Sequence, residues 1–375
     1  MSELKPFRID VPSEVLDDLH TRLAHTRWPE AECVDDWSQG IPLAYTRELA
    51  AYWADGYDWR SREAALNRFD QFTTEIDGLD IHFIHQRSPH ADALPLVITH
   101  GWPGSIVEFH KVIDPLVNPA SGRAEDAFHV VCPSLPGYGF SGKPAETGWG
   151  VGKIAQAWET LMLRLGYDRY GAQGGDWGAA VTTQIGRNGG RCVGIHLNMP
   201  IARPAAGSGG DLTEDEQQAL AAYAQHRKWG TGYSKQQSTR PQTLGYGLVD
   251  SPVGQLAWIV EKFWAWTDCD GHPENAVSRD ELLDNVMLYW ATGSGASSAR
   301  LYWESFTSFI TDGRVELPTG VAASPKEILR TPRSWCEAAY NITHWSTMPR
   351  GGHFAALEQP ELFVDDVRAF FATVR

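Results

Sequence analysis

Between residues 94 and 200, short apolar runs alternate with helix-like segments, and this alternation constrains the fold more than any other feature. Strands that alternate with helices favour a parallel sheet covered by helices. Ligand sites in such sheets lie at the carboxyl ends of the strands, where the segments HGWPG, LPGYG and GGDWG fall. The expected strands are LPLVIT, FHVVCP, RYGAQ and CVGIHLNMP, and the expected helices are VGKIAQAWETLMLRLGY and WGAAVTTQIGRN.

The rest of the chain divides around this region. The N-terminal region is an arm with a helix that Ser13 can cap, followed by a hairpin at Asp77-Gly78. A segment rich in aromatic residues opens with the capping box Thr213–Glu216 and stays helical, so we expect an inserted cap. We expect an arm with the first core strands at 1–93, the first α/β core segment at 94–200, a helical cap at 201–305 and the second core segment at 306–375.

Charge and cysteine content exclude several classes of protein. The 32 Lys and Arg against 47 Asp and Glu give a net charge of −15 without charge runs, which argues against nucleic acid or an anionic membrane as partner. The five cysteines are odd in number and contain no C-x-x-C pair, so we expect neither a disulfide framework nor a zinc site. No signal peptide and no apolar run of about 18 residues is evident. These features predict a soluble, cytoplasmic protein.

The segment Gly174-Gly175-Asp176-Trp177-Gly178 has the G-x-Nuc-x-G spacing of a nucleophile elbow. In such an elbow the central side chain projects from a sharp strand-to-helix turn, and the next backbone N–H, here that of Trp177, faces the reacting atom. The loop HGWPG follows the strand LPLVIT, and its Trp102 N–H is the candidate for a second oxyanion donor. The alternative is that both segments are ordinary tight turns, in which Asp is common.

A third motif, Arg350-Gly351-Gly352-His353, precedes the last helix. A histidine there can reach the elbow, and the order nucleophile, acid, histidine is typical of α/β-hydrolases. No H-E-x-x-H or comparable metal motif occurs, so we expect neither metal nor cofactor. Together the three motifs indicate a hydrolase whose nucleophile is Asp176.

An aspartate at the elbow narrows the reaction. A serine that attacked a saturated carbon would form an ether, which activated water cannot cleave. Asp176 would instead form an alkyl ester. Water can then attack the carbonyl carbon of that ester while the N–H groups of Trp102 and Trp177 hold the oxyanion. Substitution at saturated carbon means epoxide opening or carbon–halogen cleavage.

Several motifs resemble the microsomal-type epoxide hydrolases of the α/β-hydrolase fold, including soluble bacterial members. They span nearly the whole chain: FRIDVPSEVLDDLHTRL with TRWP, HGWPGS, LPGYGFSGKP, GGDWG, DSPVGQLAWIVEKF, NVMLYWATG and MPRGGHFAALEQPELF. The resemblance implies a mostly parallel sheet flanked by helices, with an inserted helical cap and an N-terminal arm. It also implies hydrolysis of an epoxide to a vicinal diol.

Carried over residue by residue, the resemblance makes Asp176 the nucleophile, His353 the general base and Glu327 the acid that orients the histidine. Asp312 and Glu316 are rival acids that fall outside the matching segment. It also makes Tyr233 and Tyr302 proton donors to the epoxide oxygen, which suits a phenol whose ordinary pKa is about 10. From sequence pattern alone, the tyrosines could equally be packing residues.

The resemblance leaves the substrate open. Gln236 and Gln237 are expected in the substrate pocket, and relatives in enediyne biosynthesis suggest an aromatic epoxide. A biosynthetic and a detoxifying role both fit, and the oligomeric state stays open, with a homodimer as one option. The alternative functions are a dehalogenase with the same nucleophile and a non-catalytic protein that binds a small molecule.

Overall fold

The computed structural model describes residues 3–203, 212–306 and 313–375. Its centre is a nine-stranded sheet of order β1-β2-β3-β5-β4-β6-β7-β8-β9. In this order, the first three pairs, up to β3–β5, are antiparallel, and the five pairs from β5–β4 to β8–β9 are parallel. The predicted mostly parallel sheet is therefore confirmed. The strands are β1 (Lys5–Phe7), β2 (Gln71–Ile76), β3 (Leu79–Gln86), β4 (Leu94–Thr99), β5 (Phe128–Pro133), β6 (Tyr170–Gly174), β7 (Cys192–Leu197), β8 (Val315–Ala323) and β9 (Tyr340–Thr347).

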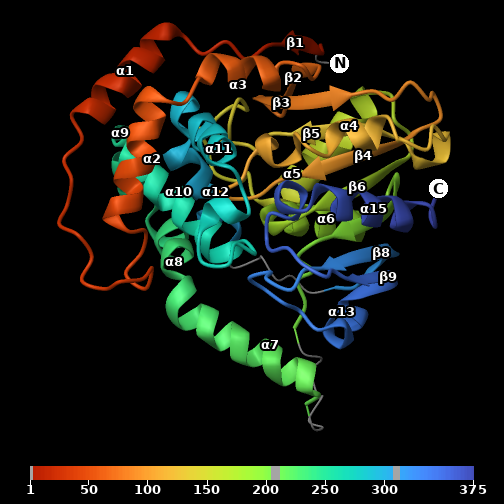
Figure 1. Cartoon of the computed structure of the whole chain (residues 1–375). Coiled ribbons are helices and arrows are strands. Elements are labelled where there is room, and N and C mark those ends of the chain that lie inside the picture. Colours follow the sequence, from red (N-terminus) through yellow and green to blue (C-terminus); the bar gives the residue numbers. More distant parts are fainter. Residues whose placement is uncertain (1–2, 204–211, 307–312) are drawn as a thin grey trace.

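Helices cover both faces of this sheet (Figure 1). A Cβ on Gly171 of β6 would lie 2.3 Å from the Phe371 ring of α15, and one on Gly174 would lie 2.2 Å from a backbone oxygen of α6. Because strand side chains alternate between faces, α15 and α6 pack on opposite sides of β6. The helices of the core and arm are α1 (Ser13–Ala24), α2 (Leu43–Asp55), α3 (Trp59–Leu66), α4 (Ile113–Val117), α5 (Val151–Arg164), α6 (Asp176–Asn188), α13 (Arg333–Ala339), α14 (Ala355–Glu358) and α15 (Pro360–Phe371).

Between β7 and β8 the described chain is helical. The predicted capping box is confirmed, because Thr213 Oγ1 accepts from Glu216 N and the Glu216 carboxylate accepts from Thr213 N. Glu216 also accepts from the indole of Trp335, which ties the start of α7 to α13. The helices here are α7 (Glu214–Gln225), the π-helix η3 (His226–Gly230), α8 (Gly232–Thr239), α9 (Pro241–Asp250), α10 (Pro252–Trp266), α11 (Arg279–Thr292) and α12 (Gly295–Ser305).

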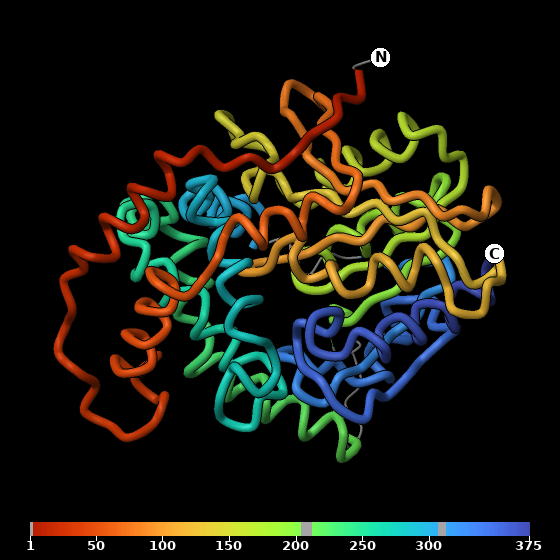
Figure 2. The backbone as a smooth tube through the Cα atoms, turned by 45° about the horizontal axis from the view of Figure 1, so that its top comes forward, coloured from red at the N-terminus to blue at the C-terminus, as the bar shows by residue number. Residues whose placement is uncertain are grey.

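After β1, the N-terminal arm wraps around the outside of these helices and returns to the sheet at β2 (Figure 2). Arg22 at the end of α1 bonds to Asp250 at the end of α9. The predicted hairpin lies between β2 and β3, and Asp77 and Gly78 have φ values of 51° and 79°, as a tight primed turn requires. Three short 3-10 helices complete the described elements: η1 (Ile106–Phe109), η2 (Ala124–Asp126) and η4 (Pro273–Asn275). None of the described helices has the length and apolar character needed to cross a membrane.

Candidate active site

Asp176 stands where β6 turns into α6, and the turn is as sharp as the spacing predicts. Its φ of 52° lies in the left-handed region, which is uncommon for a residue other than glycine. A Cβ on Gly178 would lie 1.9 Å from Thr99 O, so glycine is required for α6 to begin this close to β4. The carboxylate is buried, with 7% of the residue exposed.

The loop after β4 brings a backbone donor to this carboxylate. The Trp102 N–H donates to Asp176 Oδ1 at 2.8 Å. A Cβ on Gly101 would lie 2.2 Å from the same oxygen, so the loop can approach only because residue 101 is glycine. Trp177 follows Asp176 in the first turn of α6, where the helix dipole favours negative charge. The Asp176 carboxylate thus lies against the Trp102 N–H and at the N-terminal end of α6.

His353 lies between two carboxylates. Its Nδ1 donates to Glu327 Oε1 at 2.7 Å, and its Nε2 lies 3.5 Å from Asp176 Oδ2. All three residues are buried. Burial alone would lower the pKa of His353, but the charges and hydrogen bonds of Glu327 and Asp176 outweigh it and hold the pKa well above its ordinary value.

The rival acids do not share this geometry. Glu316 lies on β8 with 80% of its side chain exposed, 3.6 Å from Arg314. Asp312 lies outside the described residues. Glu327 is therefore the predicted acid that the structure brings to the histidine.

The loop that carries His353 is held by a residue that the sequence reasoning missed. The Glu358 carboxylate accepts the N–H groups of Gly352 and Phe354, on either side of His353, each at 3.0 Å. The His353 N–H itself donates to Trp266 O at 2.8 Å. The signal in the sequence is a carboxylate one helical turn after the motif GGHF, but only the fold shows that it turns back onto the loop.

Tyr233 of α8 and Tyr302 of α12 are buried beside Trp102 and Trp177. The Tyr233 ring stacks on Trp102 with centroids 5.1 Å apart, and the Tyr302 ring meets Trp177 edge-on at 4.8 Å. The two tyrosine rings are 5.8 Å apart. Burial and the nearby Asp176 charge raise the pKa of Tyr233 and of Tyr302 well above 10, so both phenols carry their protons at neutral pH.

The two glutamines predicted for the pocket, Gln236 and Gln237, lie in different environments. Gln237 is fully buried and accepts from the Trp258 indole at 2.9 Å. Gln236 is half-buried, and its amide donates to Arg240 O at the end of α8. A cation that the sequence did not reveal also lies here: Lys262 Nζ of α10 is 4.8 Å from the centre of the Tyr233 ring.

Within residues 3–203, 212–306 and 313–375, no group of three or more His, Cys, Asp or Glu side chains could hold a metal ion. At the elbow the structure brings together a carboxylate with an aligned donor, a histidine between two acids, and two phenols. The elbow, the order Asp176–Glu327–His353 and the mostly parallel sheet define an α/β-hydrolase fold with a buried carboxylate at the elbow position.

Comparison with known proteins narrows this class. The family model described as epoxide hydrolase N terminus matches residues 4–109, and that of the alpha/beta hydrolase fold matches residues 95–224. A Stigmatella aurantiaca protein whose name assigns it to the epoxide hydrolases is 52% identical over 99% of this chain and 86% of its own length. Epoxide hydrolase 1 of Oryctolagus cuniculus is 37% identical over 99% of this chain and 89% of its own length.

Solved structures agree. The Aspergillus niger epoxide hydrolase has a TM-score of 0.91 at 35% identity, covering 100% of this chain and 97% of that one. The juvenile hormone epoxide hydrolase of Bombyx mori has a TM-score of 0.93 at 32% identity, covering 100% and 95%. The chain belongs to the epoxide hydrolase family.

Proposed function

We propose that this chain hydrolyses an epoxide to a vicinal diol through a covalent ester on Asp176. The observation that carries the proposal is the placement of two protonated phenols against Trp102 and Trp177, on the residues that flank the carboxylate. Opening an epoxide turns its oxygen into an alkoxide, which needs a proton donor within reach of the nucleophile. A carboxylate alone would serve several reactions, and the pair of tyrosines favours this one.

In the first half of the reaction, Asp176 Oδ2 attacks an oxirane carbon, because Oδ1 is held by the Trp102 N–H. The carbon–oxygen bond of the ring breaks, and Tyr233 or Tyr302 transfers its proton to the leaving alkoxide. The resulting tyrosinate recovers a proton from the His353 imidazolium. Esterification removes the negative charge of Asp176, which lowers the pKa of His353 and leaves the imidazole neutral.

In the second half, neutral His353 takes a proton from water, and the hydroxide adds to the ester carbonyl carbon. Oδ1 becomes the oxyanion and is stabilised by the N–H groups of Trp102 and Trp177. Collapse of this intermediate expels the diol alkoxide, which takes the proton of the newly formed Asp176 carboxyl. The enzyme returns to its starting charges, with an oxygen atom from water on Asp176 and Glu327 still paired with the imidazolium.

The test is a panel of styrene-oxide-like and aliphatic epoxides, with chiral analysis of the diols. A single turnover in ¹⁸O-water should place the label on Asp176, and label found directly in the diol would overturn the ester mechanism. A His353→Gln variant should accumulate the ester, because ring opening does not need a base. If no epoxide forms an ester in that variant, a binding protein becomes the better interpretation. Halide release from haloalkanes without diol formation would favour a dehalogenase.

We also propose that residues 201–305 act as the cap that closes over the substrate between the core segments 94–200 and 306–375, with 1–93 as the arm. The many rings around Tyr233 favour an aromatic epoxide, such as those of enediyne pathways, and Gln237 is the buried glutamine of the two proposed for the pocket. The net charge of −15 argues against nucleic acid or an anionic membrane as partner. The five scattered cysteines support a location in the reducing cytoplasm. Size-exclusion chromatography distinguishes a monomer from a homodimer.

A further inference from the structure

Cap helix α11 carries two adjacent rows of polar side chains. Glu281, Asn285 and Tyr289 are spaced four residues apart, so they share one face of the helix, and Asp280 and Asp284 form the next row. Exposed fractions of Glu281, Asp284, Asn285 and Tyr289 are 7%, 3%, 1% and 2%. Burying polar groups costs free energy unless they are hydrogen-bonded. Their partners therefore indicate what the helix holds in place.

The first row, through Asn285 and Tyr289, forms hydrogen bonds to the loop that carries Trp102, the proposed oxyanion donor. Asn285 Nδ2 donates to Pro103 O at 2.7 Å, and the Ser105 hydroxyl donates to Asn285 Oδ1 at 2.7 Å. The Tyr289 hydroxyl donates to Gly104 O at 2.7 Å. Two side chains of the cap thus fix the three residues that directly follow Trp102.

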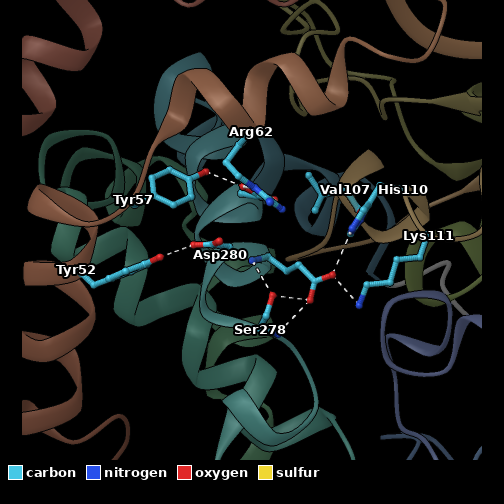
Figure 3. Close-up of polar contacts among 10 residues, drawn as sticks. Tyr52, Tyr57, Arg62, Val107, His110, Lys111, Ser278 and Asp280 are labelled. Atoms are coloured by element: carbon cyan, nitrogen blue, oxygen red, sulfur yellow. Dashed lines mark hydrogen bonds and ion pairs between the residues drawn. The ribbon is translucent and has the colours of Figure 1, made fainter.

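The same row continues along the chain after this loop. Glu281 lies 3.2 Å from His110 Nε2 and 2.6 Å from Lys111 Nζ, just beyond η1 (Figure 3). Burial alone would raise the pKa of Glu281, but the hydrogen bonds from His110, Lys111 and Ser278 hold it well below its ordinary value. The carboxylate therefore stays charged and bonded over the whole working range of pH. Residues 103–111 are held against α11 from both ends.

The second row fastens α11 to the arm (Figure 3). The Tyr57 hydroxyl donates to Asp284 Oδ1 at 2.7 Å, and Arg62 binds both oxygens of the same carboxylate. The Tyr52 hydroxyl donates to Asp280 Oδ1 at 2.7 Å. Because the arm holds α11 through this row, the helix is a fixed support against which the loop is positioned.

We propose that Asn285 and Tyr289 are positioning residues that set the direction of the Trp102 N–H. The inference rests on the proposed function, since the N–H matters as an oxyanion donor only if an ester forms on Asp176. Hydrogen bonds weaken steeply as they lose alignment. The carbonyls of residues 103 and 104 lie within two peptides of Trp102, so loss of their bonds lets that donor turn away from Asp176 Oδ1.

The two half-reactions should respond differently. In the resting enzyme the Trp102 N–H orients Asp176, which favours attack on the epoxide. It also stabilises the negative charge of Asp176, which makes the carboxylate less reactive, so the two effects oppose each other. In hydrolysis of the ester the donor acts on a developing oxyanion, where its alignment contributes most. A displaced donor should therefore slow hydrolysis by about five- to thirtyfold and change alkylation by about twofold or less.

The experiment is rapid-quench and stopped-flow kinetics with styrene oxide. It yields the rate constants of alkylation and of ester hydrolysis per active site. A loss of folded enzyme therefore changes only the amplitudes. Tyr289→Phe is the conservative variant, and Asn285→Ala is the second. Tyr52→Phe is the matched control, because it removes a tyrosine hydroxyl of the arm helix α2 that donates to Asp280 in the other row of α11. The expected result is slower hydrolysis and ester accumulation in the first two variants, with wild-type rate constants in the control.

Two results would overturn the inference: an unchanged hydrolysis rate constant in Tyr289→Phe, or an equal decrease in Tyr52→Phe. If Asn285→Ala does not fold, Tyr289→Phe alone still decides. Wild-type turnover without any ester on Asp176 is a different result, because it contradicts the proposed function on which the inference rests.

Discussion

The core side and the cap side of this active site are held by different forces. On the core side, directional contacts of 2.7 and 2.8 Å fix the Glu327–His353 pair and the Asp176 carboxylate. On the cap side, the rings of Tyr233 and Tyr302 pack against their tryptophan neighbours, with centroids about 5 Å apart. A hydrogen bond fixes an atom, whereas ring packing fixes a plane and tolerates sliding. The positions of the core groups should therefore be sensitive to the loss of single atoms, and the positions of the cap rings to changes of shape.

The largest effect is expected on the core side. Asp176→Ala removes the only group proposed to bond to carbon, so kcat/KM for epoxide hydrolysis should fall by more than about 10⁴-fold. Steady-state assays of diol formation measure it, with circular dichroism to verify folding. Retention of more than a few per cent of activity would show that the nucleophile lies elsewhere and would remove the basis of the comparison.

The cap side comes next. Each of Tyr233→Phe and Tyr302→Phe leaves one donor, so each should slow alkylation by about ten- to a hundredfold, and the double variant by about 10³-fold. Phenylalanine keeps the ring and its packing, so KM and thermal stability should change little. Single-turnover quench experiments measure the alkylation step. A double variant with full activity would mean that the tyrosines only pack, and would assign the proton to another group.

The same contrast explains what the sequence could predict. The local features of the sequence were predicted correctly. β4 coincides with the predicted LPLVIT, and the elbow, the histidine loop and the capping box at Thr213 lie where their local spacing predicts them. These features are encoded over a few residues, by strand length, glycine position and capping chemistry. The acid Glu327 followed from family resemblance, since pattern alone could not choose among the carboxylates.

Contacts that depend on how the elements pack were not predictable in this way. Glu358 returns to its own loop, Lys262 reaches Tyr233, and α11 grips residues 103–111, but each pairing depends on how elements pack. The row of Glu281, Asn285 and Tyr289 is visible in the sequence as a period of four. It could not be told from a solvent-facing stripe until the sheet and arm surrounded it.

Glu327→Gln probes the core side by removing a charge while keeping the side-chain size. It should reduce ester hydrolysis by about 10²-fold. The negative charge of Glu327 raises the pKa of His353, so its loss should lower that pKa. NMR titration of the His353 imidazole measures the shift. Glu316→Gln is the matched control and should leave both the pKa and the rate unchanged, whereas equal effects in the two variants would contradict the pairing.

The smallest effect is expected for Lys262, which tests whether the cap side is governed by shape alone. The cation lies over the Tyr233 ring, and its attraction to that ring grows when the phenol gives up its proton. Lys262→Met keeps most of the volume and removes the charge, so alkylation should slow by about three- to tenfold, with Lys262→Arg close to wild type. Single-turnover rates across pH 6 to 9 measure it. If Met and Arg variants behave alike, packing alone accounts for the cap side, and the contrast with the hydrogen-bonded core becomes sharper.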